Sequence, residues 1–277
     1  MTAASELKYP AMKYCPTDDG DLAYREAGTG DPVVLLHSGY VDHRVFDAQI
    51  PALAAAGHRV VAADIRGHGA SANASRPFRW ADDLAGLLRH LDAGPAVLVG
   101  VSMGGLVVSD MLLEHPELVR GAVLAGASTG EFQDSDPWHK EIQAETGRAL
   151  AAGDIEGWLK AFLRYVPGPH RTLDDVDPDI PRRLSEMALH TVAKHTPGEK
   201  NWHVPVTDTW PRLPKVEVPV LTVNGALDTA DVLAAAQRLA DTVRHGRSVL
   251  IEGTGHYPNM EKPEEFTAAV TDFLRIL

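Results

Sequence analysis

Short, nearly continuous apolar runs alternate along the chain with longer stretches of helical periodicity. The apolar runs, rich in valine, leucine and alanine, lie at 33–36, 59–63, 96–99, 122–125, 220–223 and 248–251. Uninterrupted hydrophobicity in such short runs is typical of parallel strands whose two faces are both covered by helices. The stretches that predict these helices lie at 47–56, 80–91, 103–114, 231–243 and 263–277. This alternation predicts an α/β fold with a mostly parallel, doubly wound sheet, to which residues 21–26 add an antiparallel edge strand.

The alternation stops between residues 131 and 213. This segment is rich in proline and has helical stretches at 142–152 and 155–165. Its tryptophans are Trp138, Trp158, Trp202 and Trp210. We predict that 131–213 is a helical cap inserted between two sheet strands of a core formed by 1–130 and 214–277. The alternative for each tryptophan is that it only fills the cap's own small core.

Composition narrows the class of protein. A chain of 277 residues, 44% of them hydrophobic, can bury a large core as one α/β domain with an insertion. Its net charge of −12 argues against nucleic acid and anionic membranes as partners, because their phosphates would repel this surface. Cys15 is the single cysteine, which excludes an internal disulfide and a cysteine metal cluster. Residues 1–10 lack a signal-peptide core and no apolar stretch is long enough for a bilayer, so we expect a cytoplasmic monomer or homodimer.

The run Gly100-Val101-Ser102-Met103-Gly104 lies between the strand at 96–99 and the helix at 103–114. A serine at a sharp turn from a buried strand into a helix has a strained backbone and an exposed hydroxyl. Glycines are needed on either side because a side chain would collide with the neighbouring strand and helix. The helix N-terminus adds N–H groups and a partial positive charge where an oxyanion would form. The run therefore predicts a catalytic serine.

Further motifs follow in a consistent order. They are Leu-Leu-His-Ser-Gly at 35–39, Asp-Ile-Arg-Gly-His-Gly-Ala-Ser at 64–71, His-Pro-Glu at 115–117, Asn-Gly-Ala-Leu-Asp at 224–228 and Gly-Thr-Gly-His at 253–256. Together with the serine turn, they resemble the α/β-hydrolase superfamily in its small capped esterase and lactonase-like branch. The resemblance covers almost the whole length, from about residue 21 to 277, and is weakest in the cap. It implies the α/β-hydrolase fold.

The resemblance also assigns a catalytic triad, which in this family runs Ser, Asp, His along the chain. Ser102 is the expected nucleophile, and His256, after the last apolar strand, is the base that a serine hydroxyl needs. Asp228 occupies the position of the acid that orients the imidazole. Asp231 is its rival, although an aspartate in the first turn of a helix is favoured by the helix dipole alone.

Other positions that match the family are expected to be structural. His37, His68 and His115 belong to this group, and Asp64 is expected to tie down a loop. No pair of histidines has convincing metal-ligand spacing next to carboxylates, so we predict no metal and no cofactor.

The oxyanion hole is expected from two backbone N–H groups. Met103 follows the nucleophile, and Gly39 is the second residue after the histidine that ends the 33–36 strand. The commonest family pattern has His-Gly where this chain has His37-Ser38, so this loop departs from the family pattern at one position. Residues beside these loops or in the cap are the candidates for substrate binding: Tyr40, Tyr257, Trp138, Trp158 and Trp202.

Taken together, these features predict a cofactor-independent serine hydrolase that cleaves a carboxylic ester or lactone through an acyl-enzyme. Acyltransferases, C–C bond hydrolases and biosynthetic cyclases on the same fold remain alternatives. Epoxide hydrolases and haloalkane dehalogenases are disfavoured, because they would have an aspartate where Ser102 stands. A ligand-binding relative without catalysis is the alternative from another class, since a fold does not determine a function.

Overall fold

The computed structural model describes residues 11–132, 135–196 and 198–277. Residues 1–10, which the sequence assigned to the core, lie outside this range, as do 133–134 and 197 of the expected cap. Among the described residues, no helix combines the length and the apolar character that a membrane crossing requires.

An eight-stranded sheet forms the centre of the fold, with the order β1-β2-β4-β3-β5-β6-β7-β8. The strands are β1 (Lys13–Cys15), β2 (Leu22–Ala27), β3 (Pro32–Leu36), β4 (Arg59–Ala63), β5 (Ala96–Val101), β6 (Val119–Ala125), β7 (Val220–Gly225) and β8 (Gly246–Ile251). The pairs β1–β2 and β2–β4 are antiparallel, and all other pairs are parallel. The predicted fold class, a mostly parallel α/β sheet, is confirmed.

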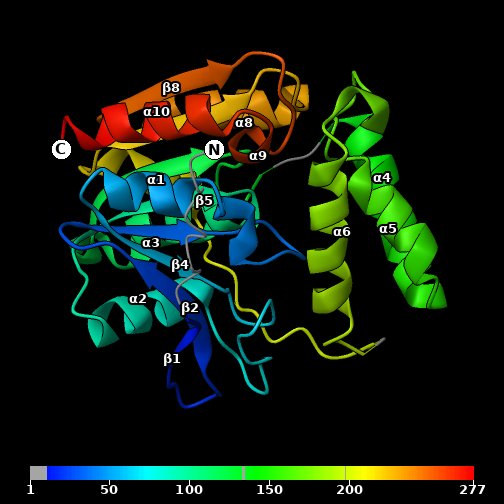
Figure 1. Ribbon diagram of the computed structural model, residues 1–277, viewed down its shortest axis with the longest axis horizontal. Helices are drawn as coiled ribbons and strands as arrows, with labels where there is room; N and C mark the ends of the chain where they lie inside the picture. The colour runs from blue at the N-terminus through cyan, green and yellow to red at the C-terminus, as the bar shows by residue number, and fades with distance from the viewer. Residues whose placement is uncertain (1–10, 133–134, 197) are drawn as a thin grey trace, which may run out of the picture.

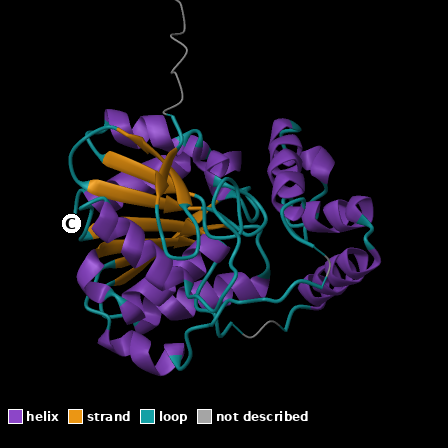
Figure 2. Cartoon of the chain, turned by 90° about the horizontal axis from the view of Figure 1, so that it is seen from below, coloured by secondary structure: helices purple, strands orange, loops and turns teal. Residues whose placement is uncertain are grey.

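Helices cover both faces of this sheet (Figure 2). The helices that lie outside residues 131–213 are α1 (Gln49–Ala55), α2 (Trp80–His90), α3 (Met103–Glu114), α8 (Ala230–Thr242) and α10 (Pro263–Leu274), with the short α9 (Pro258–Glu261). The short α7 (Thr209–Arg212) lies near the end of 131–213, before β7. Short 3₁₀ turns are at His43–Phe46, Pro116–Leu118, Leu173–Asp175 and Leu213–Lys215. Side chains alternate along each strand: Val33 and Leu35 pack with α1 and α10, whereas Val34 and Leu36 pack with α2 and α3. Both faces are therefore buried, which explains the continuous apolar runs.

Three helices between β6 and β7 lie beside the carboxyl edge of the sheet (Figure 1). These cap helices are α4 (Pro137–Ala152), α5 (Ile155–Leu163) and α6 (Asp179–Val192). Just after α6, the ammonium group of Lys194 donates to the carbonyl oxygens of His68, Gly69 and Ser71, so the end of this helix is fixed to a core loop. The division into core and cap at residues 130/131 and 213/214 remains a prediction.

Three details differ from the sequence prediction. β1 is an additional antiparallel strand, and α6 is a cap helix that the periodicity did not single out. The apolar run at 248–251 forms a strand, but β8 is the sheet edge and leaves Val249 and Leu250 exposed. Cys15, at the end of β1, is buried.

Candidate active site

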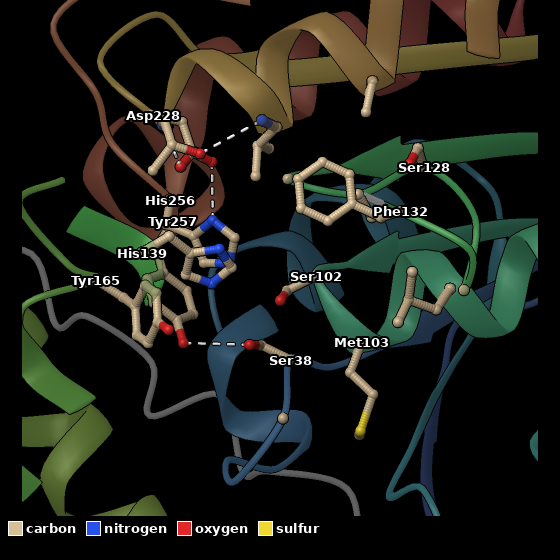
Figure 3. A pocket seen from close by; sticks show the side chains of 18 of the residues that line it. Ser38, Ser102, Met103, Ser128, Phe132, His139, Tyr165, Asp228, His256 and Tyr257 are labelled. Atoms are coloured by element: carbon tan, nitrogen blue, oxygen red, sulfur yellow. Dashed lines mark hydrogen bonds and ion pairs between the residues drawn. The ribbon is translucent and has the colours of Figure 1, made fainter. Parts of the chain in front are cut away.

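A cavity of about 380 Å³ opens where the parallel strands reach their carboxyl ends. The segments after β3, β5, β6, β7 and β8 each contribute to its wall, as ligand sites of open α/β sheets usually do. Ser102, Asp228 and His256 lie on three of these segments (Figure 3). The fold thus brings together the three residues that the sequence assigned to a triad.

The turn that holds Ser102 is as tight as its glycines predict. Ser102 has φ 52° and ψ −115°, a conformation that is strained for a residue with a side chain. A methyl group added at Gly100 would lie 2.2 Å from the carbonyl oxygen of Gly104, and one added at Gly104 would lie 2.0 Å from that of Leu36. No side chain fits at these distances. The glycines therefore allow β5, β3 and α3 to approach closely enough to raise the Ser102 hydroxyl into the cavity.

The expected base, His256, is hydrogen-bonded to a carboxylate. His256 Nδ1 lies 2.8 Å from Asp228 Oδ2, and the other Asp228 oxygen accepts the backbone N–H of Thr229 at 2.8 Å. Burial alone would lower the pKa of His256, but the charge and hydrogen bond of Asp228 outweigh it and raise this pKa above its usual 6.5. With its proton on Nδ1, the neutral ring has a lone pair on Nε2 that can accept a proton.

The rival acid is occupied elsewhere. Asp231 accepts hydrogen bonds from the backbone N–H groups of Ser135 and Asp136 and from the Ser135 hydroxyl, at 2.6 to 2.7 Å. It therefore fixes the chain just before α4. Asp228 is the carboxylate that the structure places against His256.

The histidines expected to be structural have partners in the protein. His37 is fully buried, with Nε2 accepting the backbone N–H of Ile65 and Nδ1 next to the carbonyl oxygen of Ser38. Burial lowers the pKa of His68 to about 3, and His115 lies 2.8 Å from Asp82.

One buried cluster has the composition of a metal site among the described residues. Its members are Asp42, His43 and Asp64, whose ligand atoms lie within 4.8 Å of one another. His43 Nε2 accepts from Arg25 at 2.8 Å, so its Nδ1–H donates to Asp64 at 2.8 Å, and both ring nitrogens are in use. Arg44 binds both oxygens of Asp42. Burial would raise the pKa of Asp64, but the hydrogen bond from His43 helps to lower it to about 2. The cluster is satisfied by protein groups and ties down its loop, as expected for Asp64.

The loop after β3 forms the wall opposite His256. Ser38, Gly39 and Tyr40 line the cavity, and a methyl group at Gly39 would lie 3.9 Å from the Met103 side chain. Gly39 and Met103, the two expected oxyanion donors, are therefore neighbours. Tyr40 has φ 64°, a strained conformation that turns this loop around the cavity. Tyr257 lines the cavity from the His256 side.

The cap contributes aromatic side chains, but not the predicted ones. None of Trp138, Trp158 and Trp202 is among the described residues that line the cavity. Trp158 is fully buried and stacks on Phe162, with ring centroids 5.4 Å apart, and Phe162 is the residue that reaches the cavity.

The other two tryptophans also lie outside the cavity wall. Trp138 packs edge-on against Tyr165, a cavity-lining residue, with ring centroids 5.9 Å apart. Trp202 lies in a separate groove beneath the Lys200 ammonium, 3.6 Å from its ring centroid. Hydrophobic burial explains why Trp158 packs among cap residues instead of lining the cavity, because an aromatic ring is stabilised equally in either place.

Several lining residues were not found by the sequence analysis. They are Phe162, Tyr165 and His139 from the cap, Phe132 and the segment 126–130 from the loop after β6, and Val232 and Ala235 from α8. The loop after β6 could have been found, since it follows a parallel strand at the same edge as Ser102. Nothing in the periodicity distinguishes Phe162 from its buried neighbours.

Residues 166–171 pack against the loops that hold Asp228 and His256. Gly168 has φ 77°, and a methyl group there would lie 2.5 Å from the carbonyl oxygen of Leu227, next to Asp228. Arg171 pairs with Glu261 through two hydrogen bonds of 2.8 and 3.1 Å, and Glu261 also accepts the backbone N–H of Gly255 at 2.7 Å. Residues 166–171 therefore contact the residues next to Asp228 and His256.

Comparison with known proteins identifies the family of the chain. The model of the alpha/beta hydrolase family matches residues 33–269. Epoxide hydrolase A of Mycobacterium tuberculosis is 30% identical, over 96% of this chain and 97% of that protein. A pimeloyl-[acyl-carrier protein] methyl ester esterase of Neisseria meningitidis is 28% identical, over 87% and 92%. The structure of a thermophilic esterase from Thermogutta terrifontis superposes with a TM-score of 0.77 at 26% identity, over 96% of this chain and 98% of that one.

The relatives differ in the bonds that their names say they cleave, but each is matched over almost its whole length. The matched region contains Ser102, Asp228 and His256 and leaves out only the ends of the chain. The chain belongs to the alpha/beta hydrolase family, as its motifs predict.

Proposed function

We propose that this protein is a serine hydrolase that cleaves carboxylic esters or lactones through an acyl-enzyme. The observation that carries the proposal is the hydrogen bond of 2.8 Å between His256 Nδ1 and Asp228, in the same cavity as the strained Ser102. This bond fixes the tautomer that leaves Nε2 as a base for the serine proton.

Apart from the substrate and water, the proposed reaction uses only groups of this chain. Ser102 Oγ attacks the carbonyl carbon while its proton moves to His256 Nε2, and the imidazolium that forms is stabilised by Asp228. The N–H groups of Gly39 and Met103 hold the negative oxygen. His256 then protonates the leaving oxygen, and water cleaves the acyl-enzyme by the same route. A lactone opens in the same way, with the leaving oxygen still attached to the acyl chain.

The identity of the nucleophile separates this reaction from epoxide hydrolysis. A carboxylate that opens an epoxide forms an ester, which water can cleave. The Ser102 hydroxyl would instead form an ether, which has no carbonyl for water to attack. The name of the epoxide hydrolase relative therefore does not transfer to this chain.

The cavity favours a compact, mostly apolar acyl group. Met103, Leu106, Phe132 and Phe162 are among the residues that line it, and its volume of about 380 Å³ is near the lower end for small-molecule sites. The net charge of −12 does not favour an acidic carrier protein as a partner. We therefore propose a free small-molecule ester or lactone as the substrate.

Labelling with a fluorophosphonate tests the proposal. Intact-mass analysis should find one adduct on the wild type and none on Ser102→Ala or His256→Ala. The control is Ser248→Ala, which replaces a serine on the exposed edge strand β8 and should also give one adduct. Hydrolysis of p-nitrophenyl esters should fall about 10⁴- to 10⁶-fold in both active-site variants, and the double variant should lose little more. Absence of an adduct on the wild type would refute the proposal, and transfer to an added alcohol in excess of hydrolysis would identify an acyltransferase.

A further inference from the structure

Ser38 and Tyr257 join two walls of the cavity by a hydrogen bond. Their hydroxyl oxygens lie 3.2 Å apart, and the two residues are only 3% and 1% exposed. Ser38 precedes Gly39 in the loop after β3, whereas Tyr257 follows His256 in the loop after β8. The bond therefore connects the loop that holds a proposed oxyanion donor to the loop that holds the proposed base.

The direction of this hydrogen bond follows from the chemistry of the two groups. A phenol is a better donor than an aliphatic alcohol, and burial raises the pKa of Tyr257 to about 12, so its proton stays in place at any working pH. The distance fits either oxygen as the donor. Because the phenol is the more acidic group, we assign the donor role to Tyr257 and the acceptor role to Ser38 Oγ. The Ser38 hydroxyl keeps its own proton, which it can donate to another acceptor.

The cavity offers a place for such an acceptor. In Figure 3 the hydroxyl oxygens of Ser38 and Ser102 both lie near the His256 ring, with Ser38 Oγ directed to the Tyr257 hydroxyl. Ser38 lines the cavity together with Gly39 and Met103. The backbone of Ser38 is also held in place, because His37 Nδ1 lies 2.7 Å from the Ser38 carbonyl oxygen while His37 Nε2 is used by Ile65.

We propose that the Ser38 hydroxyl is a third donor to the oxyanion of the tetrahedral intermediate, alongside the N–H groups of Gly39 and Met103. Tyr257 is its positioning residue, which holds Ser38 Oγ toward the cavity. The inference rests on the proposed function, because it needs the attack of Ser102 on a carbonyl. A glycine at position 38 would leave two donors. No proton is transferred in this step: Ser38 remains a neutral alcohol throughout.

Steady-state kinetics with a p-nitrophenyl ester tests the role of Ser38. Ser38→Ala should lower kcat on the order of 10²-fold with little change in KM, because the bond is strongest when the oxygen is charged. Ser38→Thr keeps the hydroxyl and should recover part of this loss. A trifluoromethyl ketone, which forms a tetrahedral adduct with Ser102, should bind Ser38→Ala more weakly by about the same factor as kcat falls.

The same measurements test the role of Tyr257. Tyr257→Phe should lower kcat less than Ser38→Ala does, and the double variant should be no slower than Ser38→Ala alone, because both changes act on one hydrogen bond. Tyr14→Phe, on the exposed strand β1, and Ser248→Ala are the matched controls and should leave kcat unchanged.

The outcomes separate this inference from the proposed function. If the wild type neither reacts with a fluorophosphonate nor turns over esters, the proposed function fails. If it does both, and Ser38→Ala keeps kcat within threefold or changes KM alone, only the role of Ser38 is refuted. Stoichiometric labelling of each variant shows that it is folded with Ser102 active, so a loss of kcat cannot be attributed to unfolding.

Discussion

Arg171 and Glu261 form a largely buried ion pair. Replacing one partner should lower the free energy of unfolding more than replacing both. The side chains are 14% and 7% exposed, and two hydrogen bonds join them. Arg171→Met keeps the aliphatic stem but leaves the Glu261 carboxylate buried with the Gly255 N–H as its remaining donor. An uncompensated buried charge of this kind typically costs about 3–5 kcal/mol. In Arg171→Met/Glu261→Gln no charge remains, and we expect a smaller loss than in Arg171→Met alone, because only hydrogen bonds are then lost.

The same change should also affect catalysis. Glu261 holds the backbone N–H of Gly255, and Arg171 also donates to the carbonyl oxygen of Gly253 at 3.0 Å, so both residues fix the loop that ends at His256. A displacement of the base by about 1 Å can cost on the order of 10²-fold in rate. We therefore expect kcat to fall at least about 10-fold in Arg171→Met, at a temperature where the variant is fully folded.

Urea unfolding gives the free energies, and ester turnover gives kcat. The control is Arg182→Met, since Arg182 pairs on the surface of α6 with Asp179 and Glu186 and its side chain is 57% exposed. Such surface pairs contribute about 0–1 kcal/mol. The reasoning is refuted if Arg171→Met lowers the free energy of unfolding no more than this control does. It is also refuted if the loss in the double variant equals the sum of the losses in Arg171→Met and Glu261→Gln.

Three further expectations follow from the site. The raised pKa of His256 means that kcat/KM should decline as pH falls through a midpoint above 6.5, and Asp228→Asn should move that midpoint down; a wild-type midpoint below 6.5 would contradict this. Gly104→Ala should unfold at lower urea or not fold, because its methyl group would lie 2.0 Å from a carbonyl oxygen of β3, and a stability equal to that of the wild type would be inconsistent with the packed turn. Phe162→Ala should change the preference for acyl length, whereas Trp202→Ala should not, as a panel of esters would reveal; the opposite result would place the groove of Trp202 on the substrate path.

The sheet and the cluster of Ser102, Asp228 and His256 follow from local rules. Parallel strands expose their carboxyl ends at one edge, so polar residues directly after apolar runs converge whatever the loops between them do. The glycines around Ser102 predicted a close approach of three backbones, and the separations at Gly100 and Gly104 confirm it.

Other features depend on contacts that no local pattern encodes. The run at 248–251 reads as a buried strand, but its exposure depends on β8 being the last strand of the sheet, where no further strand pairs with it. Trp158 and Phe162 lie on one helix and are both apolar and buried, yet only Phe162 reaches the cavity. The difference between a ring that packs and a ring that lines a cavity is set by how α5 is placed against Tyr40, which lies more than a hundred positions earlier in the chain.

The pairing of β6 with β7 leaves the sheet independent of the length of the segment between them. The register of these strands, Ala122↔Val220 to Leu124↔Thr222, is fixed by the sheet on both sides and does not depend on what lies between them. Doubling the length of such an insertion adds only about 0.6 kcal/mol of loop-closure entropy. The length of the segment between β6 and β7 can therefore change at little cost in free energy, as long as residues 166–171 keep their contacts with the loops that hold Asp228 and His256.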